Sequence, residues 1–149
     1  MPYQTYRPRP IIGTEGLIAE AWHWAWERHG APQLNQRFEK RTKRRMTGTD
    51  WAAWMAVKAV VEAAVRTNSA NFKTLRAYLR SDQMTLDAYK GTPSSFRPWD
   101  NQLRQPILLR THNAIIKRAP LKGFLHPTEN MDTLGYDQGD RKCKLDHAK

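Results

Sequence analysis

The sequence has one cysteine and no long apolar run. Cys143 has no second cysteine with which to form an internal disulfide or a multi-cysteine metal site, so it could pair only with something outside this chain. No apolar segment approaches the roughly 18 residues that a membrane-spanning helix needs. The N-terminal MPYQTYRPRP also lacks the apolar stretch of a secretory signal peptide. These absences exclude a disulfide-stapled domain and predict no membrane-spanning segment.

Motifs of the common catalytic classes are absent as well. The sequence contains no GxSxG, no GxxxxGK[ST] and no GxGxxG. Its five histidines do not form HExxH or another metal-ligand spacing; they are His23, His29, His112, His126 and His147. Glu20 and Glu27, seven residues apart, could share a helix face, but we interpret them as surface carboxylates. The sequence therefore predicts a protein that is not an enzyme, with no catalytic residue, no cofactor and no metal site.

Acidic residues are few relative to basic ones. The formal net charge is +11, from 25 Lys and Arg against 14 Asp and Glu. The only dense basic segment, residues 37–45, holds six basic residues and one acidic one, and the remaining charge is scattered. Such a segment at the end of an exposed helix usually faces solvent, and no base-reading motif accompanies it. We therefore expect no specific nucleic-acid partner; the alternative is a small basic nucleic-acid-binding or protein-interaction domain.

What the sequence does contain is a globular composition of single-domain size. It has 149 residues, 40% of them hydrophobic, with six Trp, five Tyr and four Phe. The clearest element is a helix over residues 47–65, which Thr47 or Thr49 can cap and whose first turn holds Asp50. Its interior charges are spaced four residues apart and form one narrow stripe: Lys58, Glu62 and Arg66. A helix with so thin a polar strip is expected to be packed on most of its circumference, as core.

The other elements are expected on both sides of this helix. Residues 11–19 are typical of a short buried strand followed by a turn, residues 18–30 fit either a helix or a strand, and residues 33–45 predict a helix after Pro32. A second helix, about residues 70–80, is expected to begin at a Ser69 cap. The chain then becomes extended, with these features in order: a turn at 98–101, a strand at 103–110 whose Pro106 favours a sheet edge, a turn at 112–113, a strand at 114–117 and an aperiodic tail from Pro120.

This order of elements resembles the C-terminal part of type 1 periplasmic binding proteins, the Leu/Ile/Val-type group that serves ABC transporters. The resemblance covers about residues 10–117 and rests on these features: Glu15-Gly16-Leu17, Phe38, the helix at 50–65, Leu75, Leu79, residues 91–96 and the hairpin at 103–117. Within that group the chain is most similar to the substrate-binding proteins associated with pyrroloquinoline quinone (PQQ)-dependent alcohol dehydrogenase systems. That closer similarity rests on the joint order of several segments: GTEGL, AWHWAWERHGAPQLNQRFE, DWAAWMAVKAV, SFRPWDNQLRQPILL, GFLH and DTLGYD.

The resemblance implies an α/β fold, with helices packed on a sheet and a C-terminal β-meander. Residues 1–119 would form the C-terminal part of a periplasmic-binding-protein-like domain whose N-terminal lobe is absent, and residues 120–149 an extended tail. Because Met1 lies inside the resemblance, we expect a truncated chain that exposes apolar surface, self-associates or pairs with the missing lobe, and binds no small molecule tightly.

The implied function is that of the solute-binding component of an ABC transporter linked to PQQ-dependent alcohol oxidation. Its partners would be a small-molecule solute and the transporter permease. The implied location is the periplasm, although a chain without a signal peptide would stay in the cytoplasm if expressed as it is.

The candidate ligand-binding residues are Glu15, Trp22 and Trp24. Trp22, Trp24 and Trp26 could stack on a flat ligand, with core packing as the favoured alternative. Amino-acid-binding relatives place an acidic residue near the turn after the first strand. Here Glu15 is the nearest carboxylate to Gly13, and two isoleucines precede that turn, so we do not expect an amino acid as the ligand.

Overall fold

The computed structural model describes residues 16–140. It contains three α-helices, which are α1 (Ala31–Thr42), α2 (Gly48–Thr67) and α3 (Phe72–Leu79). The strands are β1 (Ile18–Glu20), β2 (Ser95–Phe96), β3 (Leu103–Arg104), β4 (Ile107–Arg110) and β5 (Ile115–Ala119), and two 3-10 turns follow at Asn130–Thr133 and Gln138–Asp140. The mixed α/β class expected from the sequence is confirmed. None of the helices in residues 16–140 is long and apolar enough to cross a bilayer.

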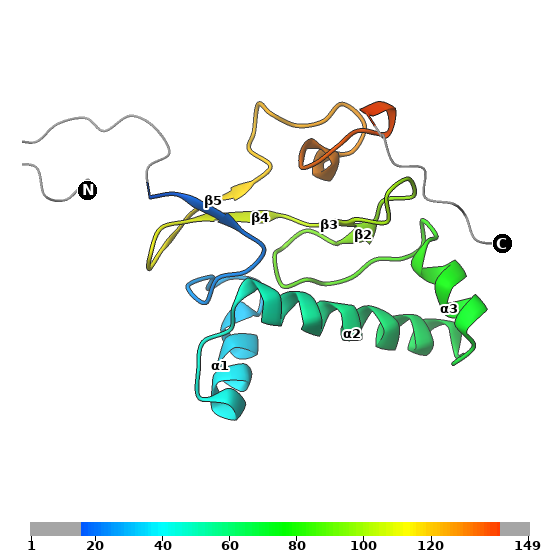
Figure 1. Cartoon of the computed structure of the whole chain (residues 1–149), viewed down its shortest axis with the longest axis horizontal. Helices are drawn as coiled ribbons and strands as arrows, with labels where there is room; N and C mark the ends of the chain where they lie inside the picture. Colours follow the sequence, from blue (N-terminus) through cyan, green and yellow to red (C-terminus); the bar gives the residue numbers. More distant parts are fainter. Residues whose placement is uncertain (1–15, 141–149) are drawn as a thin grey trace, which may run out of the picture.

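Two small antiparallel sheets form the middle of the molecule. One has the order β1-β4-β5, and the other pairs β2 with β3. Figure 1 shows the helices on one side of the strands and the C-terminal segment on the other. The buried apolar core lies between the strands, the helices and the extended segment that precedes β2. Its principal members are Trp22, Trp26, Met46, Trp51, Met55, Met84, Leu86 and Leu108.

The start of α2 follows from local chemistry. The Thr47 hydroxyl accepts a hydrogen bond from the backbone N–H of Asp50, and the Asp50 carboxylate accepts one from the backbone N–H of Thr47. This reciprocal capping box satisfies two helix-end donors. The predicted helix is thus confirmed, with Thr47 as its cap, and the predicted charge stripe is confirmed too. The Glu62 carboxylate lies 3.9 Å from Lys58 Nζ and 3.4 Å from Arg66 Nε.

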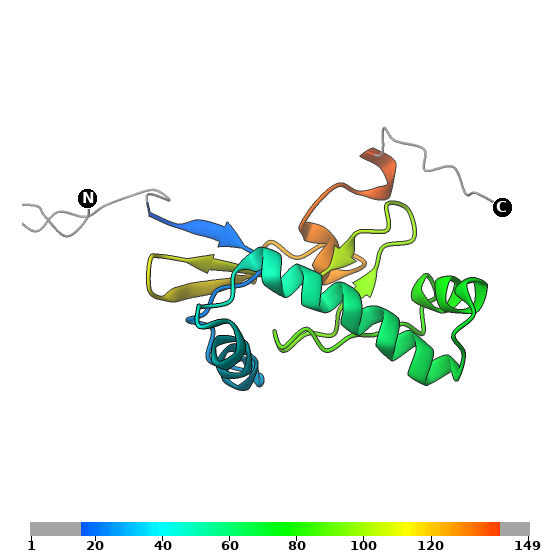
Figure 2. The same cartoon turned by 60° about the horizontal axis from the view of Figure 1, so that its bottom comes forward.

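The prediction that α2 is packed on most of its circumference is wrong for the described chain. The helix buries one stripe of four side chains, Trp51, Met55, Ala59 and Ala63. Four valines elsewhere on its surface are 48 to 73% exposed; they are Val57, Val60, Val61 and Val65. In Figures 1 and 2 no described element lies over the length of α2 on the side away from the strands. The sequence pattern predicts that α2 is apolar on most sides, but only one side of the helix packs against other described residues.

Three local expectations also need correction. Residues 21–30 form neither helix nor strand but a series of turns. Helix α3 is capped by Asn71, whose side chain accepts from the N–H groups of Lys73 and Thr74, and not by Ser69. Pro106 does not mark a sheet edge: it separates β3 from β4, and β4 is the central strand of its sheet. Because proline has no N–H to donate to a ladder, the expected single strand divides at this point.

Other local expectations hold. Helix α1 begins beside Pro32, after Gly30 in a left-handed conformation with φ 80°, and Lys43, which is also left-handed, is its C-cap. A side chain at Gly30 would come within 2.9 Å of the Tyr89 ring. The turn at residues 112–113 joins β4 to β5 as predicted. The extended segment before β2 buries every second side chain, in the order Met84, Leu86, Ala88 and Lys90.

Candidate functional site

Residues 21–30, which we call the tryptophan loop, form a rigid turn structure beside the sheet. Trp22 is fully buried, stacks on Trp51 with ring centroids 6.0 Å apart, and donates from its indole N–H to Asn35 Oδ1 at 3.0 Å. The Asn35 amide in turn donates to the carbonyl of Trp24 at 3.0 Å. A single side chain of α1 therefore fixes two positions of the loop. Trp26 is 8% exposed and donates to the Tyr89 carbonyl at 2.8 Å.

A buried histidine adds to this rigidity. His23 Nδ1 accepts from the backbone N–H of Ala25 at 3.2 Å, and the His23 carbonyl accepts from the N–H of Trp26 at 3.0 Å. Burial lowers the pKa of His23, and the positive charge of Arg110 lowers it further. The neutral imidazole is therefore favoured, which matches the acceptor role of Nδ1.

Between the tryptophan loop and β5 lies a groove of about 560 Å³, which we call the β5 groove. Its two walls are residues 24–29 and residues 113–118. The first wall includes Trp24, Trp26 and His29, and the ring centroid of His29 lies 5.9 Å from that of Trp26. The volume is within the range of small-molecule sites.

Positive charge predominates in the β5 groove. It is lined by Arg28, Lys117 and Arg118, and Glu27 is the one carboxylate among the lining residues. Arg118 donates through Nη1 to the Lys90 carbonyl. Within residues 16–140 no carboxylate forms an ion pair with any of these three cations.

Among the residues that the structure describes, Lys90 is an unusual ionisable group because it is fully buried. No carboxylate of residues 16–140 pairs with it; Nζ donates to Gln105 Oε1 at 2.6 Å and to the Pro106 carbonyl at 2.9 Å. Nζ also lies 3.8 Å from the centroid of the Trp51 ring. Burial lowers the pKa of Lys90 to about 7. The ammonium therefore loses its proton near neutral pH. It occupies a position where the alternating pattern of its segment would place an apolar residue.

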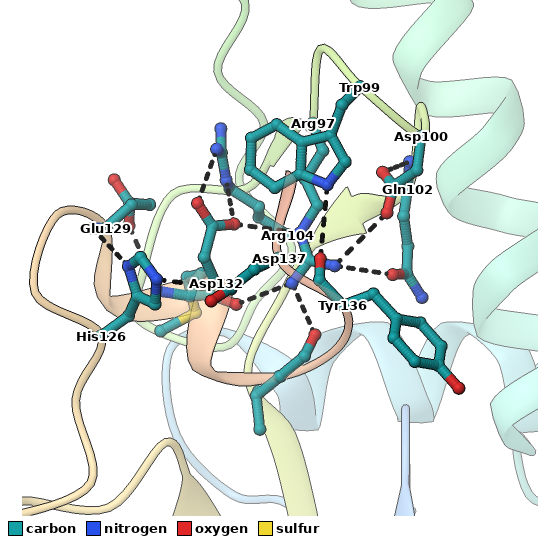
Figure 3. A network of polar contacts seen from close by, with 12 residues as sticks. Arg97, Trp99, Asp100, Gln102, Arg104, His126, Glu129, Asp132, Tyr136 and Asp137 are labelled. Carbon is teal, nitrogen blue, oxygen red and sulfur yellow. Dashed lines mark hydrogen bonds and ion pairs between the residues drawn. The ribbon is translucent and has the colours of Figure 1, made fainter. Parts of the chain in front are cut away.

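A second polar cluster, the tail clasp, holds the C-terminal segment against β2 and β3 (Figure 3). Asp132, 4% exposed, accepts from Arg97 Nε at 2.9 Å and from Arg104 Nε and Nη2 at 2.7 and 2.8 Å. Arg97 also donates to the carbonyls of Met131 and Leu134. Desolvation raises the pKa of Asp132, but hydrogen bonds and charge from the two arginines outweigh it and hold the pKa below its usual range.

The surroundings of the tail clasp are consistent with a structural role. Gln102 Oε1 accepts from Arg97 Nη1 at 2.9 Å, and the Trp99 ring lies near both guanidinium groups. Gly135, at φ 132°, leaves the space that Arg97 occupies, since a Cβ there would lie 2.4 Å from Nη1. The guanidinium of Arg97 donates to acceptors of the protein itself, so we infer that this cluster anchors the C-terminal segment. The tail, predicted as a wrapping or loose segment, is held down at Met131 and Asp132, whereas residues 135–140 are exposed.

The exposed apolar side chains of α2 continue onto α3. Phe72 is 74% exposed. A groove of about 370 Å³ is lined by side chains of α2, α3 and β2, among them Val60, Leu75, Leu79 and Phe96. We call the exposed valines of α2 together with this groove the α2–α3 face. It is apolar surface of a kind that monomers seldom leave uncovered over a large area.

The sequence-predicted ligand residues have different outcomes. Glu15 lies outside the described residues. Trp22 is a core residue with no exposed surface, in line with the favoured packing alternative, whereas Trp24 lines the β5 groove. The groove cations were not singled out from the sequence. Arg28 and Arg118 are far apart in the chain, and no local pattern connects them.

The basic segment at residues 37–45 is partly engaged within the molecule. Arg44 binds both carboxylate oxygens of Asp50, at 2.6 and 2.7 Å. The Arg45 guanidinium carbon lies 3.6 Å from the centroid of the Trp24 ring. Two of its cations therefore stabilise the junction between α1, α2 and the tryptophan loop, which leaves fewer for phosphate contact.

Comparison with known proteins finds no match among family models, curated proteins or solved structures. Within residues 16–140, no three His, Cys, Asp or Glu side chains gather into a group that could hold a metal ion.

Proposed function

We propose that this chain is the C-terminal part of a type 1 solute-binding protein that delivers a small solute to an ABC transporter permease, in a system linked to PQQ-dependent alcohol oxidation. The proposal starts from the joint order of the sequence motifs described above. The element order of the fold, with strand β1 first, helices α1 to α3 next and the β4–β5 hairpin after them, is compatible with it.

The observation that carries the proposal is the α2–α3 face. Four valines of one capped, well-formed helix are about half exposed or more, beside an apolar groove. Burying a valine or phenylalanine side chain contributes about 1.5 to 3 kcal/mol, so a surface of this kind favours a covering element. In a two-lobed binding protein the sheet and helices of the N-terminal part would supply that cover. The partner we infer is therefore the N-terminal part of the same binding protein.

The β5 groove supports a solute-binding role. Its lining includes two tryptophans and two isoleucines beside several charged side chains, so apolar and polar groups are both available to a solute. The tryptophan loop is fixed by Asn35, His23 and Tyr89, so little conformational entropy would be lost when a solute contacts it.

Assembly with an N-terminal half tests the proposal. The chain alone should self-associate in sedimentation or melt over a broad range in calorimetry. Addition of the N-terminal half of a protein with the same C-terminal motifs should give a monodisperse complex and a cooperative thermal transition. Substitution of Val61→Lys together with Val65→Lys should prevent assembly, because it places charge in the interface. Phe124→Lys is the matched control, since Phe124 is 72% exposed and lies on the tail.

Two results would contradict the proposal. One is a strictly monomeric, sharply melting chain whose properties do not change when the N-terminal half is added. The other is an equal loss of assembly in the Val61→Lys/Val65→Lys and Phe124→Lys variants, because the α2–α3 face would then have no special role.

A further inference from the structure

We infer that the β5 groove binds a small organic anion, a carboxylate carried on a flat apolar body. This inference names the solute class of the proposed binding protein and in that sense rests on the proposed function. The groove itself is built entirely from residues of this chain, so its chemistry can be tested directly.

The distribution of ion pairs supports an anion. Several arginines elsewhere in residues 16–140 are matched with carboxylates, as in Arg44 with Asp50 and Arg110 with Glu20. In the β5 groove, by contrast, Arg28 and Lys117 have no carboxylate partner among the described residues, although three cations line the same small volume. Like charges that line one groove repel one another, and a bound anion would relieve that repulsion while forming charge-assisted hydrogen bonds.

Arg118 adds directional donors to these charges. One of its terminal nitrogens donates to the Lys90 carbonyl, which fixes the side chain against the wall of the groove. A guanidinium has five N–H donors in a fixed plane, so the others stay available for a carboxylate. The same contact makes Arg118 a poor residue to mutate, because its loss would also disturb the Lys90 segment.

The aromatic wall supports a flat body for the ligand. Trp24 and Trp26 line the groove, and the Arg45 guanidinium covers the Trp24 ring at 3.6 Å. Trp26 is held by Tyr89 and by its contact with His29, so its ring is already oriented. Trp24, which is only partly buried, can offer stacking surface to an aromatic or conjugated ligand, whereas Trp26 is 8% exposed and supports the wall from behind. A simple inorganic anion would leave this part of the groove unused.

The groove discriminates against cations and against amino acids in particular. Glu27 is the only carboxylate among its lining residues, and it is exposed. An α-ammonium group would therefore meet three positive charges and one solvated negative one. A carboxylate without an amine satisfies the groove better.

Binding of sodium benzoate to the 149-residue chain tests the inference. Ligand titration followed by NMR should show saturable shifts of tryptophan-loop and β5 signals. Methyl benzoate has nearly the same body but no charge, and benzylamine has the opposite charge; both should bind at least about tenfold more weakly. The double substitution Arg28→Gln/Lys117→Gln should weaken benzoate binding by about tenfold or more at low salt. Arg41→Gln, an exposed cation of α1 outside the groove, is the matched control and should change binding little.

Several outcomes would overturn the inference. They are the absence of saturable benzoate binding, equal binding of methyl benzoate, tighter binding of inorganic phosphate than of benzoate, or equal losses in the groove and control variants. These outcomes are measured on the chain alone, at a concentration where sedimentation shows one species, so they do not require assembly with an N-terminal half. Benzoate could bind as expected while assembly fails, which would refute the proposed function alone. Assembly could also succeed while benzoate shows no groove-specific binding, which would refute the solute class alone.

Discussion

The buried ammonium of Lys90 should make the stability of the fold rise with pH above neutrality. The pKa of Lys90 falls from 10.5 to about 7 because burial removes the charged group from water. Between those two values the unfolded chain holds a proton that the folded chain has released. Stability therefore increases with pH across this window, and it is lowest below pH 7, where folding must bury the ammonium.

The magnitude follows from the two pKa values. At about 1.4 kcal/mol for each pH unit, the full change from 10.5 to about 7 corresponds to roughly 5 kcal/mol. Between about pH 7 and 9 the expected gain is about 2 to 3 kcal/mol. Gln105, the Pro106 carbonyl and the Trp51 ring all favour the charged form, so they limit the size of the effect. Since stabilities of small domains are only about 5 to 15 kcal/mol in total, this change is large enough to measure.

Urea unfolding followed by tryptophan fluorescence measures the effect, at a concentration where sedimentation shows one species. In the Lys90→Met variant the rise between about pH 7 and 9 should disappear, because the titrating group is gone. Lys117→Met removes an exposed lysine instead and should leave the rise in place. A flat profile in the unsubstituted chain, or the same slope in Lys90→Met, would refute the reasoning. The buried Lys90 side chain would then stay charged in the folded chain, and its contacts would compensate for the loss of hydration.

Three further outcomes are expected. Ala59→Asp places a carboxylate in the core and should lower the free energy of unfolding by several kcal/mol. Val61→Asp changes a side chain that is 54% exposed and should lower it by about 1 kcal/mol or less. Urea titration of both variants tests which face of α2 is buried. Asp132→Asn should cost about 3 to 5 kcal/mol, because two largely buried arginines lose their shared carboxylate, and protease cleavage after residue 120 should become faster. Duplex DNA should bind weakly and without sequence preference, and binding should collapse between roughly 50 and 200 mM salt; selective binding at physiological salt would instead support a nucleic-acid function.

Features that depend on near neighbours in the chain were predictable from the sequence. Thr47 and Asp50 of the capping box are three positions apart, and the Lys58–Glu62–Arg66 stripe spans about two helical turns. Pro32 could mark the beginning of α1 for the same reason, since a proline at the first turn fits a helix without any distant contact. In each case the stabilising partner lies within a few residues, so the pattern already contains the whole interaction.

Features that depend on distant partners were decided only by the tertiary structure. Residues 21–30 carry both a helical and an alternating pattern, and contacts of Trp22 with Asn35 and of Trp26 with Tyr89 favour turns over either. Lys90 becomes a buried amine because its alternating segment packs on Trp51, and the β5 groove exists because residues 24–29 and 113–118, far apart in the chain, form its two walls. Helix α2 is a further example of a feature that the sequence alone did not decide. Composition determines how much of a helix can be buried, but only the packing of other elements determines which part of it is.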